Sequence, residues 1–241
     1  MVMEKSKLEK FITKYNLGGS CESVILKSDG DKLSVRAISD DKNVLGEVTL
    51  EDIKFPEGEF GVYETKKLRS ILSVLDENLT IKPNTNNGKT TGLNITDGST
   101  KATFVLADAS VIPNVPDLKK LPPMDLTISL DEKFVNTFIK AKGALSEVET
   151  FAVLSKGDDT TAEVVIGHSN LNTNRITVTA KTDKAVKMEP VNFSANYLRE
   201  ILTANKDITN GTFQVSSKGL SVVKFNDKGF TSTYYLVQIS S

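Results

Sequence analysis

The sequence is poor in the side chains that many enzymes and metal proteins use. Its 241 residues include one cysteine, Cys21, one histidine, His168, and no tryptophan. A single cysteine excludes a disulfide within the chain, and a structural zinc site needs four nitrogen or sulfur ligands. We therefore expect no metal, no cofactor and a reducing, cytoplasmic location.

Long apolar runs are also missing. No stretch approaches the roughly 18–20 consecutive apolar residues that span a bilayer, and residues 1–5 lack the apolar core of a secretory signal. Apolar residues make up 39% of the chain and charged residues 25%, which is typical of a globular protein rather than a disordered one. The sequence therefore predicts a soluble protein with no membrane partner.

Catalytic motifs are equally scarce. His168 follows a strand-like segment without a nucleophile motif, and we interpret it as a partly exposed loop residue. No glycine-rich phosphate loop is present, because Gly18-Gly19 follow a helical segment and mark its end. Paired carboxylates lie among Gly, Ser, Lys and Thr, which favours hairpin turns at Asp29 and Asp31, Asp40 and Asp41, and Asp158 and Asp159. The sequence predicts no enzyme, although a hydrolase that uses isolated carboxylates stays an open alternative.

The chain does contain a repeated pattern of strands and helices. Short segments of alternating polarity predict half-buried antiparallel strands. Four other segments, 5–15, 65–75, 131–142 and 194–205, carry apolar residues at helical spacing. They recur every 60 to 67 residues, and each is followed by three strand-like runs; the last three are also preceded by one. We predict an α+β fold of four β-α-β-β-β units, two in each of two similar domains, with the helices on one face of antiparallel sheets.

A connector at residues 110–124 separates the predicted domains, 1–109 and 125–241. It holds four of the seven prolines, which restrict the chain to extended conformations. The connector also carries apolar side chains at Val111, Ile112, Val115, Leu118 and Leu121. They either pack back onto the sheets or border a groove for a partner.

Basic residues gather on the helical segments. These segments together carry a net charge of +5, whereas the whole chain carries −1, and the bases fall opposite the apolar stripes. Only four of the 30 basic residues are arginines. Lysine is a flexible point charge that suits phosphate contact without base reading. Phe11, Phe134 and Phe138 belong to the apolar stripes, which argues against a stacking platform for single strands.

With this pattern of strands, helices and charge, the chain resembles a known family, the DNA polymerase sliding clamps. Within that family it is most similar to the processivity factors of large myovirus-type tailed phages. The similarity covers nearly the whole chain and is one of pattern and length. It is clearest in residues 62–65 and 71–75, in the connector leading to residues 138–141, in residues 192–194 and in the tail at 233–237.

The resemblance implies a homotrimeric, head-to-tail ring that encircles duplex DNA, with helices lining the hole and sheets outside. It implies DNA-facing side chains at Lys7, Lys10, Lys14, Lys66, Lys67, Arg69, Lys133, Lys140, Arg199 and Lys206. It implies a subunit interface formed by the edge strands Thr103, Phe104, Val105 and Leu106, and Ile176, Thr177, Val178, Thr179 and Ala180.

The resemblance also implies partners. These are double-stranded DNA, the replicative DNA polymerase, a clamp loader that opens the ring, and late-transcription factors, in the cytoplasm of an infected bacterial host cell. Partner peptides would bind in a groove bordered by Val111, Ile112, Val115, Leu118, Tyr235 and Val237. The alternative from another class is a β-rich trimeric phage structural protein, which explains the many Thr, Asn and Ser residues but not four basic helices.

Overall fold

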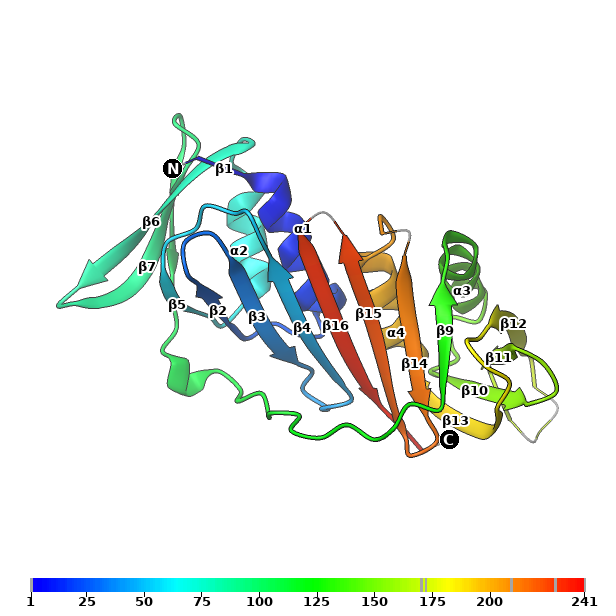
Figure 1. Cartoon of the computed structure of the whole chain (residues 1–241). Helices are drawn as coiled ribbons and strands as arrows, with labels where there is room; N and C mark the ends of the chain where they lie inside the picture. Colours follow the sequence, from blue (N-terminus) through cyan, green and yellow to red (C-terminus); the bar gives the residue numbers. More distant parts are fainter. Residues whose placement is uncertain (1, 170, 172, 209, 228, 241) are drawn as a thin grey trace. The chain divides into compact units, whose positions relative to one another are not determined.

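The computed structural model describes residues 2–169, 171, 173–208, 210–227 and 229–240, and it confirms the α+β class (Figure 1). Contacts divide the chain into two compact units. The first unit groups the described parts of 1–40, 46–116 and 228–232, and the second groups those of 41–45, 117–227 and 233–241. The main division, between residues 116 and 117, falls inside the segment 110–124.

The first half of the chain forms two antiparallel sheets and two helices. Its elements are β1 (Met3–Glu4), α1 (Lys5–Asn16), β2 (Val24–Ser28), β3 (Leu33–Ile38), β4 (Val44–Leu50), β5 (Gly58–Val62), α2 (Thr65–Leu72), β6 (Asn78–Asn86), β7 (Lys89–Thr96) and β8 (Lys101–Val105). One sheet has the order β5-β2-β3-β4 and the other β1-β6-β7-β8. Helices α1 and α2 pack against each other on one face of the first sheet (Figure 1).

The second half repeats this plan. Its elements are β9 (Leu126–Leu130), α3 (Glu132–Ala144), β10 (Thr150–Lys156), β11 (Thr161–Ile166), β12 (Ile176–Lys181), β13 (Lys187–Ser194), α4 (Ala195–Ala204), β14 (Gly211–Ser216), β15 (Leu220–Asp227) and β16 (Phe230–Val237). One sheet contains β16-β15-β14-β9 and the other β12-β11-β10-β13, and α3 packs against α4.

Each of the four α-helices is thus preceded by one strand and followed by three, which confirms the predicted unit. The sequence pattern missed β1, because its two residues are too few to show an alternation. β1 pairs with β6 through Met3 with Leu79 and Glu4 with Asn78. None of the helices in the described residues is long and apolar enough to cross a membrane.

The four predicted helices form for the reasons that their sequences indicate. In α1 the stripe Leu8, Phe11 and Ile12 is at most 1% exposed. The helix ends where Leu17 and Gly18 take left-handed backbone conformations, with φ of 47° and 68°. In α4, Ser194 is the predicted N-cap, and its hydroxyl accepts a hydrogen bond from the Tyr197 N–H at 3.3 Å.

Aromatic contacts centre the core of the second unit on Phe151. Its ring centroid lies 5.4 Å from that of Phe138 on α3, 5.8 Å from that of Phe193 on β13 and 6.1 Å from that of Phe213 on β14. Each of these side chains is fully buried. These contacts attach the apolar side of α3 to the core of its unit, so the polar side of the helix is left outside.

Candidate nucleic-acid interface

The first unit presents a basic surface made by α1 and α2. With their apolar stripes buried, the two helices leave Lys10, Lys66, Lys67 and Arg69 exposed and Lys7 half-buried. All five are predicted DNA-facing residues, and the structure brings them together because α1 packs against α2.

The second unit presents the equivalent surface on α3 and α4. Lys133 and Lys140 are exposed on α3, and Arg199 is exposed on α4. Lys206 is exposed as well, but it lies two residues beyond the end of α4 at Ala204. Lys142, which contributed to the helix charge in the sequence, is buried, and its ammonium donates to the carbonyl oxygen of Ser146 at 2.8 Å.

Lys14 is a correction to the predicted DNA-facing set. Its side chain is only 1% exposed, and its Nζ lies 5.3 Å from the centroid of the Phe230 ring in the same unit. The spacing of Lys7, Lys10 and Lys14 placed all three on one helical face, but Lys14 lies at the border where α1 meets the rest of the unit. A buried ammonium cannot contact a phosphate, so we remove Lys14 from the surface.

Charge pairing distinguishes the helix surface from the β5-β2-β3-β4 sheet of the first unit. Around the sheet, cations meet carboxylates at Lys27–Glu59 (2.8 Å), Lys32–Glu51 (3.1 Å), Arg36–Glu47 (3.1 Å) and Lys54–Asp31. Among the predicted DNA-facing residues, those without an ion pair to any described residue are Lys66, Arg69, Lys133, Lys140 and Lys206. Their uncompensated charge leaves these surfaces suited to a polyanion.

Three further helix cations pair only with neighbours in sequence. The distances are 3.5 Å for Lys7–Glu4, 2.6 Å for Lys67–Glu64 and 3.9 Å for Arg199–Glu200. Exposed pairs of this kind contribute little to stability, so such lysines can exchange a carboxylate for a phosphate at small cost.

Two strands predicted to join subunits lie at sheet edges. β8 is the last strand of β1-β6-β7-β8, and β12 is the first of β12-β11-β10-β13. On β8 the Val105 side chain is 74% exposed, whereas Phe104 is buried. On β12, Val178 and Ala180 are buried while Thr177 and Thr179 are exposed. Leu106 lies just after β8, where its N–H donates to Thr91.

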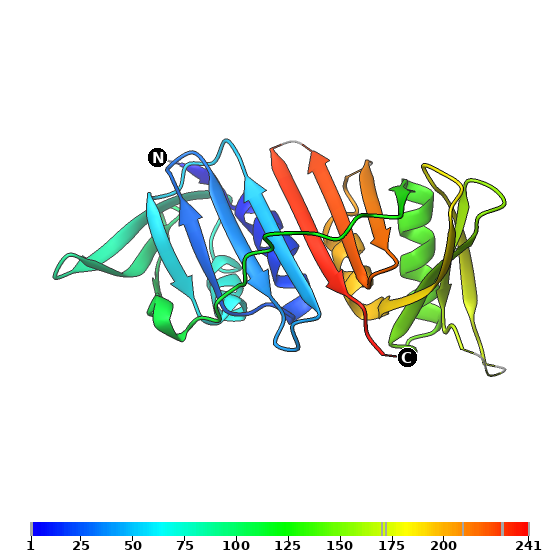
Figure 2. The same cartoon turned by 60° about the horizontal axis from the view of Figure 1, so that its bottom comes forward.

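The segment that follows β8 crosses the face of the β5-β2-β3-β4 sheet opposite α1 and α2 (Figure 2). Two contacts hold it there. Ile112 is 7% exposed and lies against Gly61, whose missing side chain also lets Ala107 pair with β5. Farther along, the Arg36 guanidinium donates to the Pro116 carbonyl at 2.7 Å and to Glu47 at 3.1 Å.

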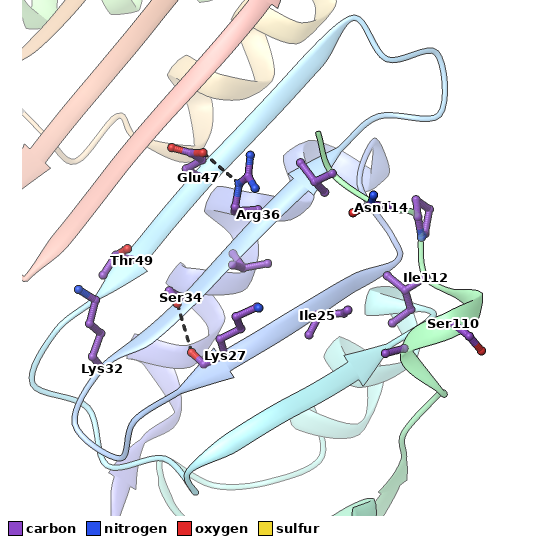
Figure 3. Close-up of a pocket in the computed structure, with 14 residues that line it drawn as sticks. Ile25, Lys27, Lys32, Ser34, Arg36, Glu47, Thr49, Ser110, Ile112 and Asn114 are labelled. Atoms are coloured by element: carbon purple, nitrogen blue, oxygen red, sulfur yellow. Dashed lines mark hydrogen bonds and ion pairs between the residues drawn. The ribbon is translucent and has the colours of Figure 1, made fainter. Parts of the chain in front are cut away.

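Between these contacts a pocket of about 820 Å³ lies within the first unit (Figure 3). The sheet contributes Ile25 and Arg36, and the segment contributes Ile112 and Val115. Among the predicted groove residues only Ile112 and Val115 line it; Val111 and Leu118 do not, and Tyr235 and Val237 lie on β16 of the second unit. Of the two roles that the sequence left open, packing on the sheet is confirmed for Ile112, and Ile112 and Val115 also border this pocket. A role of the pocket in binding a partner stays a prediction.

The remaining sequence interpretations concern possible catalytic groups. His168 lies in the loop after β11 and is half-buried, as predicted. The paired aspartates at 29 and 31, 40 and 41, and 158 and 159 lie in turns or bends. In the part of the chain that the structure describes, no group of three or more His, Cys, Asp or Glu side chains could hold a metal ion.

Comparisons with known proteins confirm the fold. The structure is similar to the crystal structure of proliferating cellular nuclear antigen from Entamoeba histolytica, with a TM-score of 0.74, 13% identity and coverage of 99% of this chain and 98% of that chain. It is also similar to the PCNA2–PCNA3 complex from Sulfolobus tokodaii, with a TM-score of 0.73, 12% identity and 99% coverage of both chains. No protein-family model and no curated protein sequence matches the chain. At these identities the similarity establishes the DNA-clamp fold along the full length.

Proposed function

We propose that the protein is a sliding clamp, which encircles duplex DNA as a homotrimeric ring and tethers the replicative DNA polymerase. The observation that carries this proposal is the placement of unpaired cations. Lys66, Arg69, Lys133 and Lys140 lie on the exposed sides of helices in both units, whereas four cations around the β5-β2-β3-β4 sheet are paired with carboxylates. The shared fold supports it independently.

The chemistry of this surface suits movement along DNA. Phosphate contacts from lysine are independent of base sequence and exchange with counterions, so a ring with such a lining holds DNA without a preferred position. Processivity then comes from topology, because a closed ring must open before it can leave the template. The predicted lining is Lys7, Lys10, Lys66, Lys67, Arg69, Lys133, Lys140, Arg199 and Lys206.

Ring closure would use the edge strands. An unpaired strand edge is a template for another chain, and a head-to-tail arrangement of β8 against a neighbour's β12 satisfies both edges in every subunit. Three subunits with four helices each would surround the DNA. The many exposed backbone groups of these edges make a free monomer the less favourable state.

The proposed partners beyond DNA are a clamp loader, the replicative polymerase and late-transcription factors in an infected bacterial cell. A loader is needed because the chain carries no glycine-rich phosphate loop with which to hydrolyse ATP. The pocket bordered by Ile25, Ile112 and Val115 is a candidate site for the apolar anchor of a partner peptide.

One experiment separates a clamp from an ordinary DNA-binding protein. The protein is loaded onto nicked circular duplex DNA by its clamp loader with ATP, and the complex is isolated. A clamp stays on the circle and slides off once the DNA is cut to a linear form. Equal retention on circular and linear DNA contradicts the proposal, and no retention on either favours the alternative, a β-rich trimeric phage structural protein.

A further inference from the structure

The two helices of the first unit lack the local caps that usually begin a helix. The N-cap positions of α1 and α2 are Glu4 and Glu64, and neither carboxylate accepts a hydrogen bond from a backbone N–H of its own helix. The first N–H groups of a helix have no partner inside it and need an acceptor from elsewhere. For both helices that acceptor comes from a distant glutamate.

Glu22, in the loop that follows α1, caps α2. Its backbone oxygen accepts the Thr65 N–H at 3.0 Å, and its Oε2 accepts the Lys66 N–H at 2.8 Å. Its Oε1 accepts from the side-chain amide of Asn16, the last residue of α1, at 2.9 Å. One carboxylate therefore connects the end of α1 to the start of α2.

Glu77, in the loop that follows α2, caps α1 in the same way. Its backbone oxygen accepts the Lys5 N–H at 2.7 Å, and its Oε1 accepts the Ser6 N–H at 3.1 Å and the Ser6 hydroxyl at 2.6 Å. In both helices the glutamate backbone takes the first N–H and the carboxylate takes the second. The first turn of each helix is thus capped by a glutamate in the loop that follows the other helix.

The second unit does not use this arrangement. Asp131 caps α3 locally by accepting the Phe134 N–H at 2.7 Å, and Ser194 caps α4. Glu149 occupies the place of Glu22, because its backbone oxygen accepts the first N–H of α4, from Ala195, at 2.8 Å. Its carboxylate accepts no hydrogen bond from any described residue, so Glu149 is a natural control for Glu22.

We propose that Glu22 and Glu77 are positioning residues of the basic surface: by capping each other's helices, they hold α1 and α2, and hence Lys7, Lys10 and Lys66, in one fixed arrangement. The inference rests on the proposed function, since it assigns these residues a role in DNA contact. Lys66 carries one of the capped N–H groups, and Lys7 follows Ser6, which carries the other. Loss of either carboxylate releases a first turn that presents a cation.

If the two glutamates position the cations, the expected change in DNA affinity on their removal is opposite in sign to the change that charge alone predicts. Both glutamates are negative charges beside a surface for a polyanion, so their removal should strengthen DNA binding if charge alone counts. If they position the cations, their removal should weaken binding instead, because fewer phosphate contacts form at once. The sign of the change therefore distinguishes the two explanations.

The test measures equilibrium affinity for a short linear DNA duplex by fluorescence anisotropy across a range of salt concentrations. The variants are Glu22→Gln, Glu22→Ala and Glu77→Ala, with Glu149→Gln and Glu149→Ala as controls. We expect Glu22→Ala and Glu77→Ala to bind DNA roughly fivefold more weakly, because this is the factor that corresponds to the typical contribution of one helix cap. The slope of log affinity against log salt should fall by about one.

Glu22→Gln should be intermediate, because an amide oxygen can still accept the Lys66 N–H while the charge is gone. The Glu149 variants should bind DNA as tightly as the parent or more tightly. Amide exchange should become faster at Lys66 in Glu22→Ala and at Ser6 in Glu77→Ala. If Glu22→Ala unfolds, the Gln variant decides the matter alone.

The inference is overturned if the Glu22 variants bind DNA as tightly as the Glu149 variants, or if exchange at Lys66 is unchanged. Failure of the proposed function looks different. In that case the parent protein is retained equally on circular and linear DNA, and the order of the Glu22 and Glu149 variants on the short duplex still reports whether the capping residues position the cations.

Discussion

The ammonium of Lys14 lies over the ring of Phe230, with Nζ 5.3 Å from the ring centroid. A cation over an aromatic face is attracted by the ring's electron density, and the attraction grows when water is excluded. Lys14 is 1% exposed and Phe230 is 8% exposed, so water is largely absent from this contact. The lysine is therefore part of the packing between α1 and residues 229–232, and its charge is held inside the unit.

Substitution of Lys14 should consequently affect stability rather than DNA contact. We expect Lys14→Glu to lower the free energy of unfolding by about 3 kcal/mol or more, because it buries a carboxylate against an aromatic face. Lys14→Met keeps the volume and should cost less than about 1.5 kcal/mol. Urea denaturation of both variants, with Lys10→Glu as the exposed control, measures these changes. A fully stable Lys14→Glu protein with weakened DNA binding would return Lys14 to the DNA-facing surface.

Sequence patterns predicted the helices and the repeat because an amphipathic stripe such as Leu8, Phe11 and Ile12 reports burial directly. They missed β1, whose pairing with β6 is a long-range contact without a local signal. They misplaced Lys14 because the spacing of residues indicates on which side of a helix a side chain lies, but not which other parts of the chain pack against that side. The capping by Glu22 and Glu77 was equally invisible, since each partner lies more than forty residues away in the chain.

Charge reversal on the helix surfaces should abolish processive synthesis without unfolding the protein. The quadruple variant changes Lys10, Lys66, Lys140 and Arg199 to glutamate. Each side chain is exposed, so we expect only a small loss of stability, below about 2 kcal/mol in total. The measurement is loader-dependent DNA synthesis at moderate salt, with trimer formation followed by sedimentation.

A matched control reverses four exposed lysines that lie on strands rather than helices: Lys82, Lys156, Lys187 and Lys224. It changes the net charge by the same amount, so it should retain most of the processive synthesis. Normal synthesis by the helix variant, or equal loss in both variants, would show that the helices do not face DNA.

The edge strand β8 offers a direct test of subunit association. Val105 is 74% exposed in the chain, and the proposed ring would cover it. Val105→Glu should weaken association about tenfold or more, because it buries a charge at a strand edge, while the fold of each subunit stays intact. Val74→Glu is the matched control, since Val74 is 67% exposed just beyond α2. A substitution on the other proposed edge strand, such as Val178→Pro on β12, would test association less cleanly, because Val178 is buried and pairs with Val164, so the fold of the subunit would be disturbed as well.

Acid should loosen the capping of α1. Hydrogen bonds from the hydroxyl and the N–H of Ser6 lower the pKa of Glu77. A carboxylate whose pKa is lowered by folding stabilises the protein above its unfolded pKa of about 4.3, and that contribution is lost as the pH falls through the folded pKa. The parent should therefore lose more stability than Glu77→Gln between about pH 5 and pH 2. Urea midpoints measured across this range test the point, and parallel curves would contradict it.

Substitutions at two neighbouring residues distinguish peptide binding in the pocket from the structural role of the connector. Ile25 is half-buried and lines the pocket, whereas Ile112 also fastens the segment against Gly61. Ile25→Ser should leave the connector in place and weaken binding of a peptide from the cognate polymerase about tenfold, as expected for a lost apolar anchor contact. Ile112→Ser should reduce stability by about 1–3 kcal/mol as well, because it empties a packed position.

Leu118→Ser provides the control, since Leu118 is 40% exposed and does not line the pocket. It should change neither property. Calorimetric titration with the peptide gives the affinity, and thermal unfolding gives the stability of the same samples. If Ile25→Ser binds the peptide as the parent does while Ile112→Ser only loses stability, then the apolar side chains serve to attach the connector to the sheet, and partners dock elsewhere on the protein.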